Sequence, residues 1–263
     1  PTIYQLTCYI NKQTSAMVQD EFRSSKQQSL ITKRPALIPL SFSQEGLWFL
    51  QQLGTNESSY NMPIMLSLNG PLNSSALEES LQALVCRHEI LRTNYGYINN
   101  QLVQIIHQEN QQKNILTTID WLESPVAQEQ QHNLSAAMKN EVHFCFDLEK
   151  DPLVRFFLFK LAKNEFCLLA NFHHSIFDAW SIDILLNELS QYYNHFHKNA
   201  PLSLEHLEYQ YADYACWQRE HLSDAYLTIH RAYWLLALKD APTSINLPAH
   251  KLAKNLAMSS KAN

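Results

Sequence analysis

The sequence predicts a layered domain of the α/β or α+β class. Short apolar runs typical of strands alternate with longer segments in which apolar residues recur every three or four positions. Residues that cap helix starts precede several of the longer segments. The 263 residues, 46% of them hydrophobic, are enough to bury a sizeable core.

The composition argues against two classes of function. The 20 lysine and arginine residues are scattered and the formal net charge is -5, so the basic stripe that a phosphate backbone requires is absent. We therefore expect no nucleic-acid partner. With only four glycines, neither GxxxxGK[ST] nor GxGxxG occurs, which disfavours ATP and dinucleotide folds.

Cysteines and apolar runs indicate the compartment. The five cysteines are odd in number and widely spaced, which indicates buried thiols in a reducing environment. The longest apolar runs, such as residues 166–172, are far shorter than the roughly 20 residues of a membrane helix. The first residues show no secretion-signal pattern. We therefore expect a cytoplasmic protein without membrane association.

The first predicted element is a short helix. Residues 1–33 are rich in Gln, Ser, Thr and Lys, and we interpret them as an extension or linker. Ser41 and Ser43 are candidate N-caps, and Gln44 completes a capping box with Ser41. The helix is expected to end near Gly54.

A strand, a helix and a hairpin are predicted next. Residues 64–68 form the strand. Ser75 and Glu78 make a second capping box, which opens a helix extending through residues 87–93. Two short strands then flank residues 99–100, both asparagines, as a hairpin.

Two antiparallel strands follow a further helix. That helix is predicted to run to about Val142, with Ser124 as N-cap and Pro125 in its first turn. The strands are residues 153–161 and 166–172. Their connection is short and polar, so we expect them to pair antiparallel.

Three more helices complete the predicted elements. Ser181 is a candidate N-cap for the first, and it is a better cap than nucleophile because no base stands beside it. Aromatic-rich helical segments follow at residues 209–217 and 226–238. Tryptophans near helix starts are expected to pack into the core. They are Trp48, Trp180 and Trp217.

Two adjacent histidines stand at the end of a predicted strand. His173 and His174 follow an apolar run, and Asp178 stands four residues beyond His174. Successive strand residues point to opposite sides, so one imidazole should face a cavity while the other packs. A histidine can accept a proton near neutral pH. Asp178 can bind a histidine, ligate a metal, or pair with Arg87 or Arg92.

A metal site is disfavoured at this pair. Adjacent histidines rarely chelate one ion, and an HExxH-like spacing on a helix is absent. We therefore expect no metal. Among twelve histidines, chance adjacency would be the default interpretation if the pair stood alone.

Four ordered segments accompany the pair, and together they resemble the condensation domains of nonribosomal peptide synthetases. They lie between residue 35 and about residue 218. The segments are SFSQEGLWFL at 41–50, followed by YNMP at 60–63; RHEILRT at 87–93; HHSIFDAWS at 173–181, similar to the family's HHxxxDGxS; and YADYACWQ at 211–218.

The resemblance implies a lobe like chloramphenicol acetyltransferase, an α+β two-layer sandwich with helices packed on a mixed sheet. A complete domain of the family pairs two such lobes, and the histidine motif faces a tunnel between them. Residues 34–218 would be the N-terminal lobe, and residues 219–263 the start of a truncated inter-lobe region. Without the second lobe, we expect little activity from the chain alone.

The resemblance also implies a chemistry, in which an amide bond forms between an aminoacyl or peptidyl thioester and an acceptor amine. His174 would accept a proton from the amine or position it, with His173 as its supporting neighbour. Asp178 would be a structural acid paired with an arginine, for which Arg87 and Arg92 are the candidates.

The three residues that follow Asp178 would lie beside the substrate. Ala179 would orient the thioester through its backbone amide. Trp180 and Ser181 would contact the substrate. Ala179 replaces the glycine of the family motif, and an alanine would be strained there at positive φ. Gly46 replaces an arginine of the first segment and weakens a helix interior by about 1 kcal/mol relative to alanine.

The implied partners are proteins. Peptidyl carrier proteins would deliver both thioesters on phosphopantetheine arms, with no covalently bound cofactor in the lobe itself. The missing C-terminal lobe and adjacent synthetase domains would be further partners. Two alternatives stay open: an HxxxD-type acyltransferase acting on a free acyl thioester, and an inactive remnant or carrier-docking module.

Overall fold

The structure, a computed structural model, describes five stretches of the chain and divides it into two compact units. The units are residues 1–220 and 221–263, and each is considered by itself. The predicted extension at 1–33 and the predicted cap at Ser124 and Pro125 lie outside the described residues. The described stretches are 34–54, 58–109, 115–120, 127–222 and 224–242.

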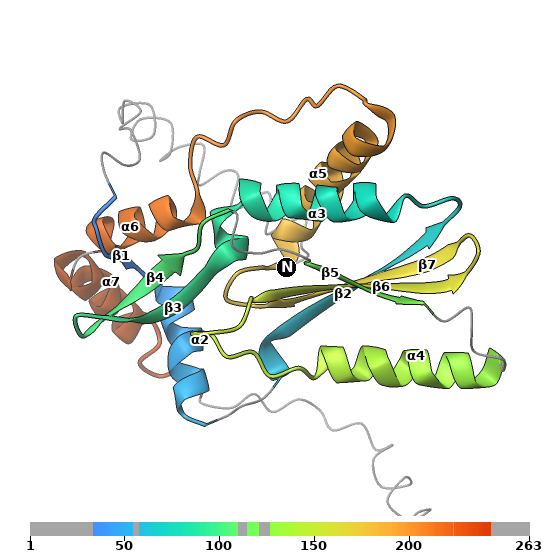
Figure 1. Ribbon diagram of the computed structural model, residues 1–263. Helices are drawn as coiled ribbons and strands as arrows, with labels where there is room; N and C mark the ends of the chain where they lie inside the picture. Colours follow the sequence, from blue (N-terminus) through green and yellow to red (C-terminus); the bar gives the residue numbers. More distant parts are fainter. Residues whose placement is uncertain (1–33, 55–57, 110–114, 121–126, 223, 243–263) are drawn as a thin grey trace, which may run out of the picture. The chain divides into compact units, whose positions relative to one another are not determined.

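The elements alternate along the chain as the sequence predicts (Figure 1). The strands are β1 (Ile38–Pro39), β2 (Asn61–Asn69), β3 (Thr93–Ile98), β4 (Gln101–Ile106), β5 (Leu116–Asp120), β6 (Val154–Ala162) and β7 (Glu165–His173). The helices are α2 (Phe42–Gln52), α3 (Ser74–Arg87), α4 (Ala127–Val142), α5 (Ala179–Lys198), α6 (Tyr211–His221) and α7 (Asp224–Ala237), with short 3-10 helices η1 (Ser58–Tyr60) and η2 (Glu89–Arg92).

The larger sheet is mixed. Its strand order is β2-β7-β6-β5, with β7 antiparallel to both neighbours and β5 parallel to β6. The predicted antiparallel pair is therefore confirmed as β6 and β7, in a register that places Val154 opposite Phe172. The predicted mixed sheet with helices packed on it is confirmed as well.

Helices cover both faces of this sheet. Phe156 and Leu158 of β6 belong to the main core cluster, together with residues of α3 and α5. The alternate residues Phe157 and Phe159 form a second cluster with Met138 of α4. Because successive strand residues point to opposite faces, α4 lies on the face away from α3 and α5, as Figure 1 shows. The helix predicted to end near Val142 thus adds a layer to the sandwich.

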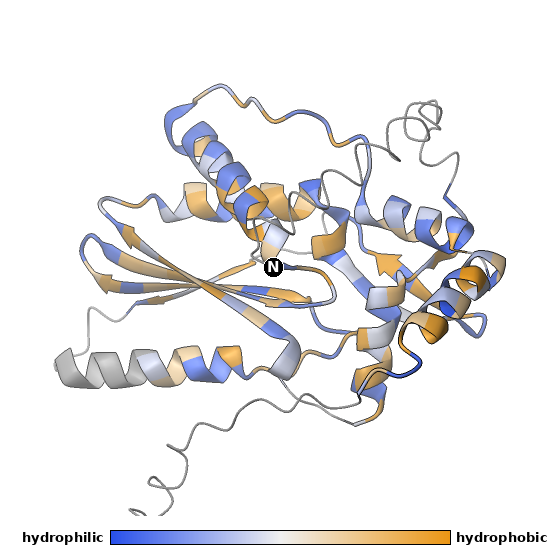
Figure 2. Cartoon of the chain, turned by 180° about the vertical axis from the view of Figure 1, so that it is seen from behind, coloured by the Kyte–Doolittle hydropathy of each residue, from blue (hydrophilic) through white to orange (hydrophobic). Residues whose placement is uncertain are grey.

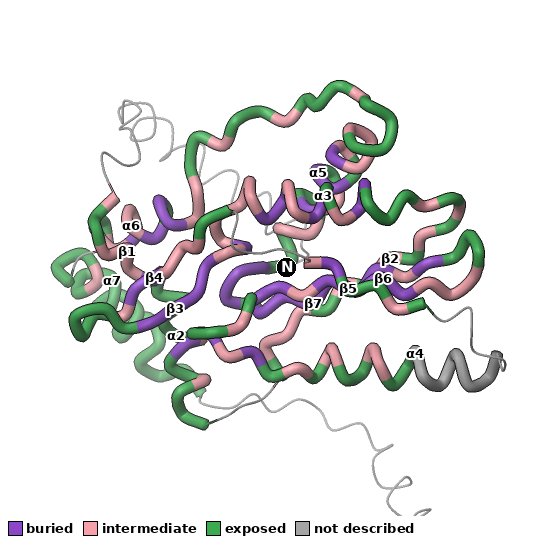
Figure 3. The backbone as a smooth tube through the Cα atoms, viewed as in Figure 1, coloured by how far each residue is buried: buried purple, intermediate pink, exposed green. Residues whose placement is uncertain are grey.

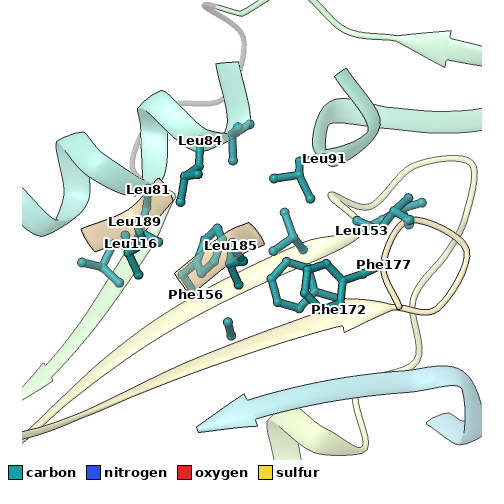
Figure 4. Close-up of a cluster of buried hydrophobic side chains, with 14 of the residues drawn as sticks. Leu81, Leu84, Leu91, Leu116, Leu153, Phe156, Phe172, Phe177, Leu185 and Leu189 are labelled. Carbon is teal, nitrogen blue, oxygen red and sulfur yellow. The ribbon is translucent and has the colours of Figure 1, made fainter. Parts of the chain in front are cut away.

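The main core lies between the sheet and the helices α3 and α5. Figure 4 shows leucines of both helices above Phe156 and Phe172. Hydrophobic residues follow the strands of the larger sheet (Figure 2), and burial is concentrated along β3, β6 and β7 (Figure 3). The labelled helix residues are Leu81, Leu84, Leu185 and Leu189.

A smaller sheet has the order β1-β4-β3 and contains the predicted hairpin. Asn99 and Asn100 form its turn, with φ of 51° and 62°. Asparagine tolerates this left-handed conformation better than most residues, because its short polar side chain can hydrogen-bond locally. The hairpin prediction is confirmed.

Helix starts agree with the sequence in one case and differ in another. The capping box of Ser41 and Gln44 is present with both of its hydrogen bonds. The box predicted at Ser75 is wrong, because Asn73 is the N-cap of α3 and the Ser75 hydroxyl donates to Glu79 instead.

The end of α3 also differs from the prediction. The helix stops at Arg87, because His88 is extended, with φ of -101° and ψ of 103°. The rest of the predicted helical segment forms the separate η2. In the second unit, the predicted aromatic-rich helix is confirmed as α7. No described helix has the length and apolar character needed to cross a membrane.

Candidate active site

The adjacent histidines leave β7 in a tight turn that ends at α5. The backbone N–H of His173 donates to the carbonyl of Leu153 at 2.9 Å, and that of His174 donates to the carbonyl of Tyr60 at 2.8 Å. The first bond ties the turn to the start of β6 and the second to the start of β2. The strand ends therefore position both imidazoles.

His173 is held inside as a neutral imidazole. Its side chain is buried, with 6% of the residue exposed, and its ring lies near the rings of Tyr60 and Phe146. The backbone N–H of Ser175 lies 3.2 Å from Nδ1, and the Ser175 hydroxyl lies 2.8 Å from it. A backbone N–H only donates, so Nδ1 is the acceptor and the proton of the neutral ring sits on Nε2. Burial, with a smaller effect of His174, lowers the pKa of His173 to about 4.

His174 has the opposite tautomer and faces outward. Its Nδ1 lies 2.8 Å from the carbonyl oxygen of Phe177, which can only accept, so Nδ1 carries the hydrogen. The lone pair of the neutral ring is then on Nε2. The residue is exposed, and no hydrogen-bond partner of Nε2 is found among the described residues. The prediction that the two histidines point to opposite sides, with one of them packed, is confirmed. That the other faces a cavity stays a prediction.

Asp178 is the N-cap of α5. One of its carboxylate oxygens accepts the backbone N–H of Ser181 at 3.0 Å and the Ser181 hydroxyl at 2.7 Å. The predicted cap at Ser181 is therefore wrong, because the acid side chain at the preceding extended position takes that place. The predicted pairing of Asp178 with an arginine is also wrong within the described residues.

The two candidate arginines are engaged elsewhere. Arg87 lies with its Nε 3.1 Å from Oε1 of Glu188 on α5. Arg92 donates to the carbonyl of His107 and lies 3.9 Å from Oε1 of Glu109. Both arginines thus form ion pairs, but with Glu188 and Glu109 and not with Asp178.

The first turn of α5 differs from expectation at two residues. Ala179 is its first residue and is not among the described residues with positive φ, so the predicted backbone strain is wrong. Trp180 is 87% exposed, so its predicted core packing is wrong, whereas Trp48 is buried as predicted. Five residues of helix separate Trp180 from the buried Leu185, which is about 140° of rotation. The indole therefore lies on the face away from the core.

Two residues behind the turn were missed at the sequence level. Tyr95 of β3 is fully buried, and its hydroxyl donates to the carbonyl of Ser175 at 3.0 Å. The same hydroxyl accepts from the amide of Gln44 at 3.2 Å. Burial raises the pKa of Tyr95. A tyrosine in a buried strand must find a polar partner, and that was the available signal.

Of two cavities in the described part of the chain, one lies at the turn and the other is lined by residues outside it. One of about 90 Å³ is lined mainly by apolar residues of η2, the histidine turn and α5, among them Ile176 and Phe177. The other, of about 460 Å³, is lined by charged and polar residues that include Arg87 and Arg92. Within the described stretches, no three or more His, Cys, Asp or Glu side chains gather in a way that could hold a metal.

Comparison with known proteins decides the family. The condensation domain model matches residues 36–262. The chain belongs to the condensation domain family. One of the linear gramicidin synthase proteins of Brevibacillus parabrevis is 38% identical over 248 residues, which is 94% of this chain and 5% of that protein. Malpinin synthetase of Mortierella alpina is 38% identical over 244 residues, which is 92% of this chain and 3% of that protein.

Solved condensation-domain structures agree. The X-domain from teicoplanin biosynthesis superposes with a TM-score of 0.69 at 27% identity, covering 83% of this chain and 47% of that one. The starter condensation domain of rhizomide synthetase superposes with a TM-score of 0.70 and covers 86% of this chain and 57% of that one. Because its sequence identity is 16%, it supports the fold alone. This condensation domain chain thus spans about half of those structures and only 5% and 3% of the two synthetases named above. The family resemblance seen in the sequence is confirmed.

Proposed function

We propose that the chain supplies one wall of a site where a carrier-bound acceptor amine attacks a carrier-bound aminoacyl or peptidyl thioester. The supporting observation is the opposed tautomers of the two histidines. His173 turns its lone pair inward to Ser175, whereas His174 leaves its Nε2 lone pair outward. A free imidazole lone pair is what proton transfer from an amine requires.

The proposed step transfers the acyl group from sulfur to nitrogen. The amine nitrogen forms a bond to the thioester carbon, the carbon–sulfur bond breaks, and the proton lost by nitrogen passes through Nε2 of His174 to the departing sulfur. His173 takes no part in proton transfer, because the two hydrogen bonds from Ser175 occupy the lone pair of its Nδ1 and its ring is buried. Its part is to hold the turn.

The start of α5 is suited to the thioester. The first backbone N–H groups of a helix have no acceptor within the helix and carry a partial positive charge. Asp178 satisfies the N–H of Ser181, and within the described stretches no acceptor is found for those of Ala179 and Trp180, so these two can face a developing negative charge on the carbonyl oxygen. The exposed indole of Trp180 adjoins them and offers an apolar surface to a phosphopantetheine arm.

Carrier proteins are the partners that this function requires. The matched relatives are synthetases such as linear gramicidin synthase, which supports assignment to carrier-bound substrates. Phosphopantetheine would arrive on those carriers, so the lobe itself needs no covalently bound cofactor. The second lobe of the domain would supply the opposite wall.

The test is amide formation between two loaded carrier proteins, measured with the protein at its full encoded length. His174→Ala should lower the rate about 10²–10⁴-fold, the usual contribution of a general base. His195→Ala is the matched control, because His195 also places Nδ1 2.8 Å from a backbone carbonyl, that of Ala200, at the far end of α5. A His174→Ala protein as fast as the control would refute the proposed role.

A docking function is the second candidate, and one observation favours it. The X-domain from teicoplanin biosynthesis, at 27% identity, has been solved in complex with OxyB, so that domain binds a protein partner. If this chain only docks carriers, the wild type will show no turnover, and carrier binding will be equal in wild type and His174→Ala.

A further inference from the structure

We propose that Tyr95 and Gln44 are positioning residues for His174, acting through the carbonyl of Ser175. The effect on turnover rests on the proposed function, whereas the effect on the geometry of the turn does not. Neither residue touches the outward face of the turn. Tyr95 is 0% and Gln44 is 1% exposed, so they act from inside the lobe.

A chain of hydrogen bonds runs from Ser41 through Gln44 and Tyr95 to Ser175. The bond at Ser41 determines which group donates in each of the bonds that follow. The backbone N–H of Ser41 can only donate, and it lies 3.0 Å from Oε1 of Gln44. The amide is therefore oriented with its Nε2 toward Tyr95, at 3.2 Å. Since the Tyr95 hydroxyl accepts that bond, its own hydrogen is directed to the carbonyl of Ser175 at 3.0 Å.

Ser175 joins this connection directly to His173, and only the backbone of the turn links it to the partner of His174. Its backbone N–H and hydroxyl hold Nδ1 of His173. Two residues further along the turn, the carbonyl of Phe177 holds Nδ1 of His174. Because Ser175 and Phe177 belong to the same short turn, we expect a shift of the Ser175 carbonyl to move the Phe177 carbonyl, which sets the tautomer of His174.

The connection also joins segments that are distant in sequence. Gln44 belongs to the capping box of α2, and Tyr95 lies in β3. The hydroxyl of Ser41 lies 2.9 Å from that of Tyr211 on α6. The turn is thereby fixed relative to three elements rather than to its own strand alone.

Two variants test the proposal. Tyr95→Phe keeps the ring but removes the donor to Ser175. Gln44→Glu, measured at a pH where this carboxyl is ionised, keeps an acceptor for the N–H of Ser41, but its second oxygen can only accept, so the Tyr95 hydroxyl turns to it and leaves Ser175. We expect kcat to fall about 10–100-fold in each, the scale of a small misplacement of a catalytic group, with KM within about twofold.

The second readout is the ¹⁵N NMR spectrum of the imidazoles, which reports the tautomer without turnover. Wild-type His174 should be mainly the Nδ1–H form, and both variants should shift it toward a mixture. Tyr193→Phe is the control, because it removes a hydroxyl that accepts the backbone N–H of Asn73, away from the turn. It should change neither readout.

The outcomes separate the two proposals. If wild type shows no amide formation but the tautomer shifts in both variants, the positioning role stands and the proposed function fails. If both variants lose stability while kcat and the tautomer of His174 stay at wild-type values, the role is structural and the inference is overturned. If the Tyr95→Phe protein does not fold, the kcat and the His174 tautomer of Gln44→Glu alone decide whether the positioning role holds.

Discussion

Arg87 places its Nε 3.1 Å from Oε1 of Glu188, and the other oxygen of that carboxylate lies 2.6 Å from Nε2 of His88. The side chains of Arg87 and Glu188 are 15% and 9% exposed. This pair joins the end of α3 to the middle of α5. The arginine of the second sequence segment therefore supports the helix that follows the histidine turn.

Replacing Glu188 should destabilise the fold. Glu188→Gln removes the negative charge and leaves the largely buried Arg87 uncompensated, so the free energy of unfolding should fall by about 3 kcal/mol. Urea denaturation measures it. Lys150→Met breaks the exposed pair of Lys150 with Asp147, which solvent screens, and should lower the free energy of unfolding far less than Glu188→Gln does. Equal effects of the two substitutions would contradict the assignment.

Stability should depend on pH through His173. Its pKa is lowered from the ordinary 6.5 to about 4, so between these values the unfolded chain binds more protons than the folded one. The stabilisation is complete above about pH 6.5 and is lost as the pH falls toward 4, by about 3 kcal/mol in all. Denaturation at a series of pH values measures this slope. His173→Gln should flatten it, and an unchanged slope would show that another group titrates.

The two motif tryptophans should respond in opposite ways to truncation. Trp48→Ala empties a buried position and should lower the free energy of unfolding by about 3–5 kcal/mol. Trp180→Ala removes an 87% exposed ring and should change it by no more than about 0.5 kcal/mol. Under the proposed function, the second variant should still raise KM for carrier-bound thioesters. A large loss of stability on Trp180→Ala would mean that the indole is packed.

Two glycines with equal free space should differ through their backbone. A Cβ added at Gly46 or Gly70 meets no atom within 4 Å, but Gly70 has φ of +112° whereas Gly46 lies in α2. Gly46→Ala should stabilise by about 0.5–1 kcal/mol through helix propensity. Gly70→Ala should destabilise by about 1–2 kcal/mol because an L side chain is strained at that φ. Thermal unfolding of both variants tests this contrast. Stability changes of the same sign in the two variants would refute it.

Local chemistry predicted much of the chain correctly. The capping box of Ser41 and Gln44, the asparagine hairpin at residues 99–100 and the antiparallel strands each depend on neighbours a few residues apart. The opposite directions of His173 and His174 follow from the strand period. The motif order was sufficient to identify the family.

Errors arose where two candidates of similar local merit competed. Asn73 and Ser75 are both good N-caps, as are Asp178 and Ser181, and the backbone conformation at the helix entry decided each case. Trp180 has an apolar ring like Trp48, but its angle around α5 directs it away from the sheet.

The sequence by itself determined the family, most of the segments that make helices and strands, and the histidine pair with its inward and outward members, because these depend on spacing and local hydrogen bonding. Only the tertiary structure decided that Arg87 pairs with Glu188 and that Tyr95 holds the carbonyl of Ser175. Those contacts join residues 101 and 80 positions apart. Their geometry is set by how the helices and the two sheets pack, which no local pattern specifies.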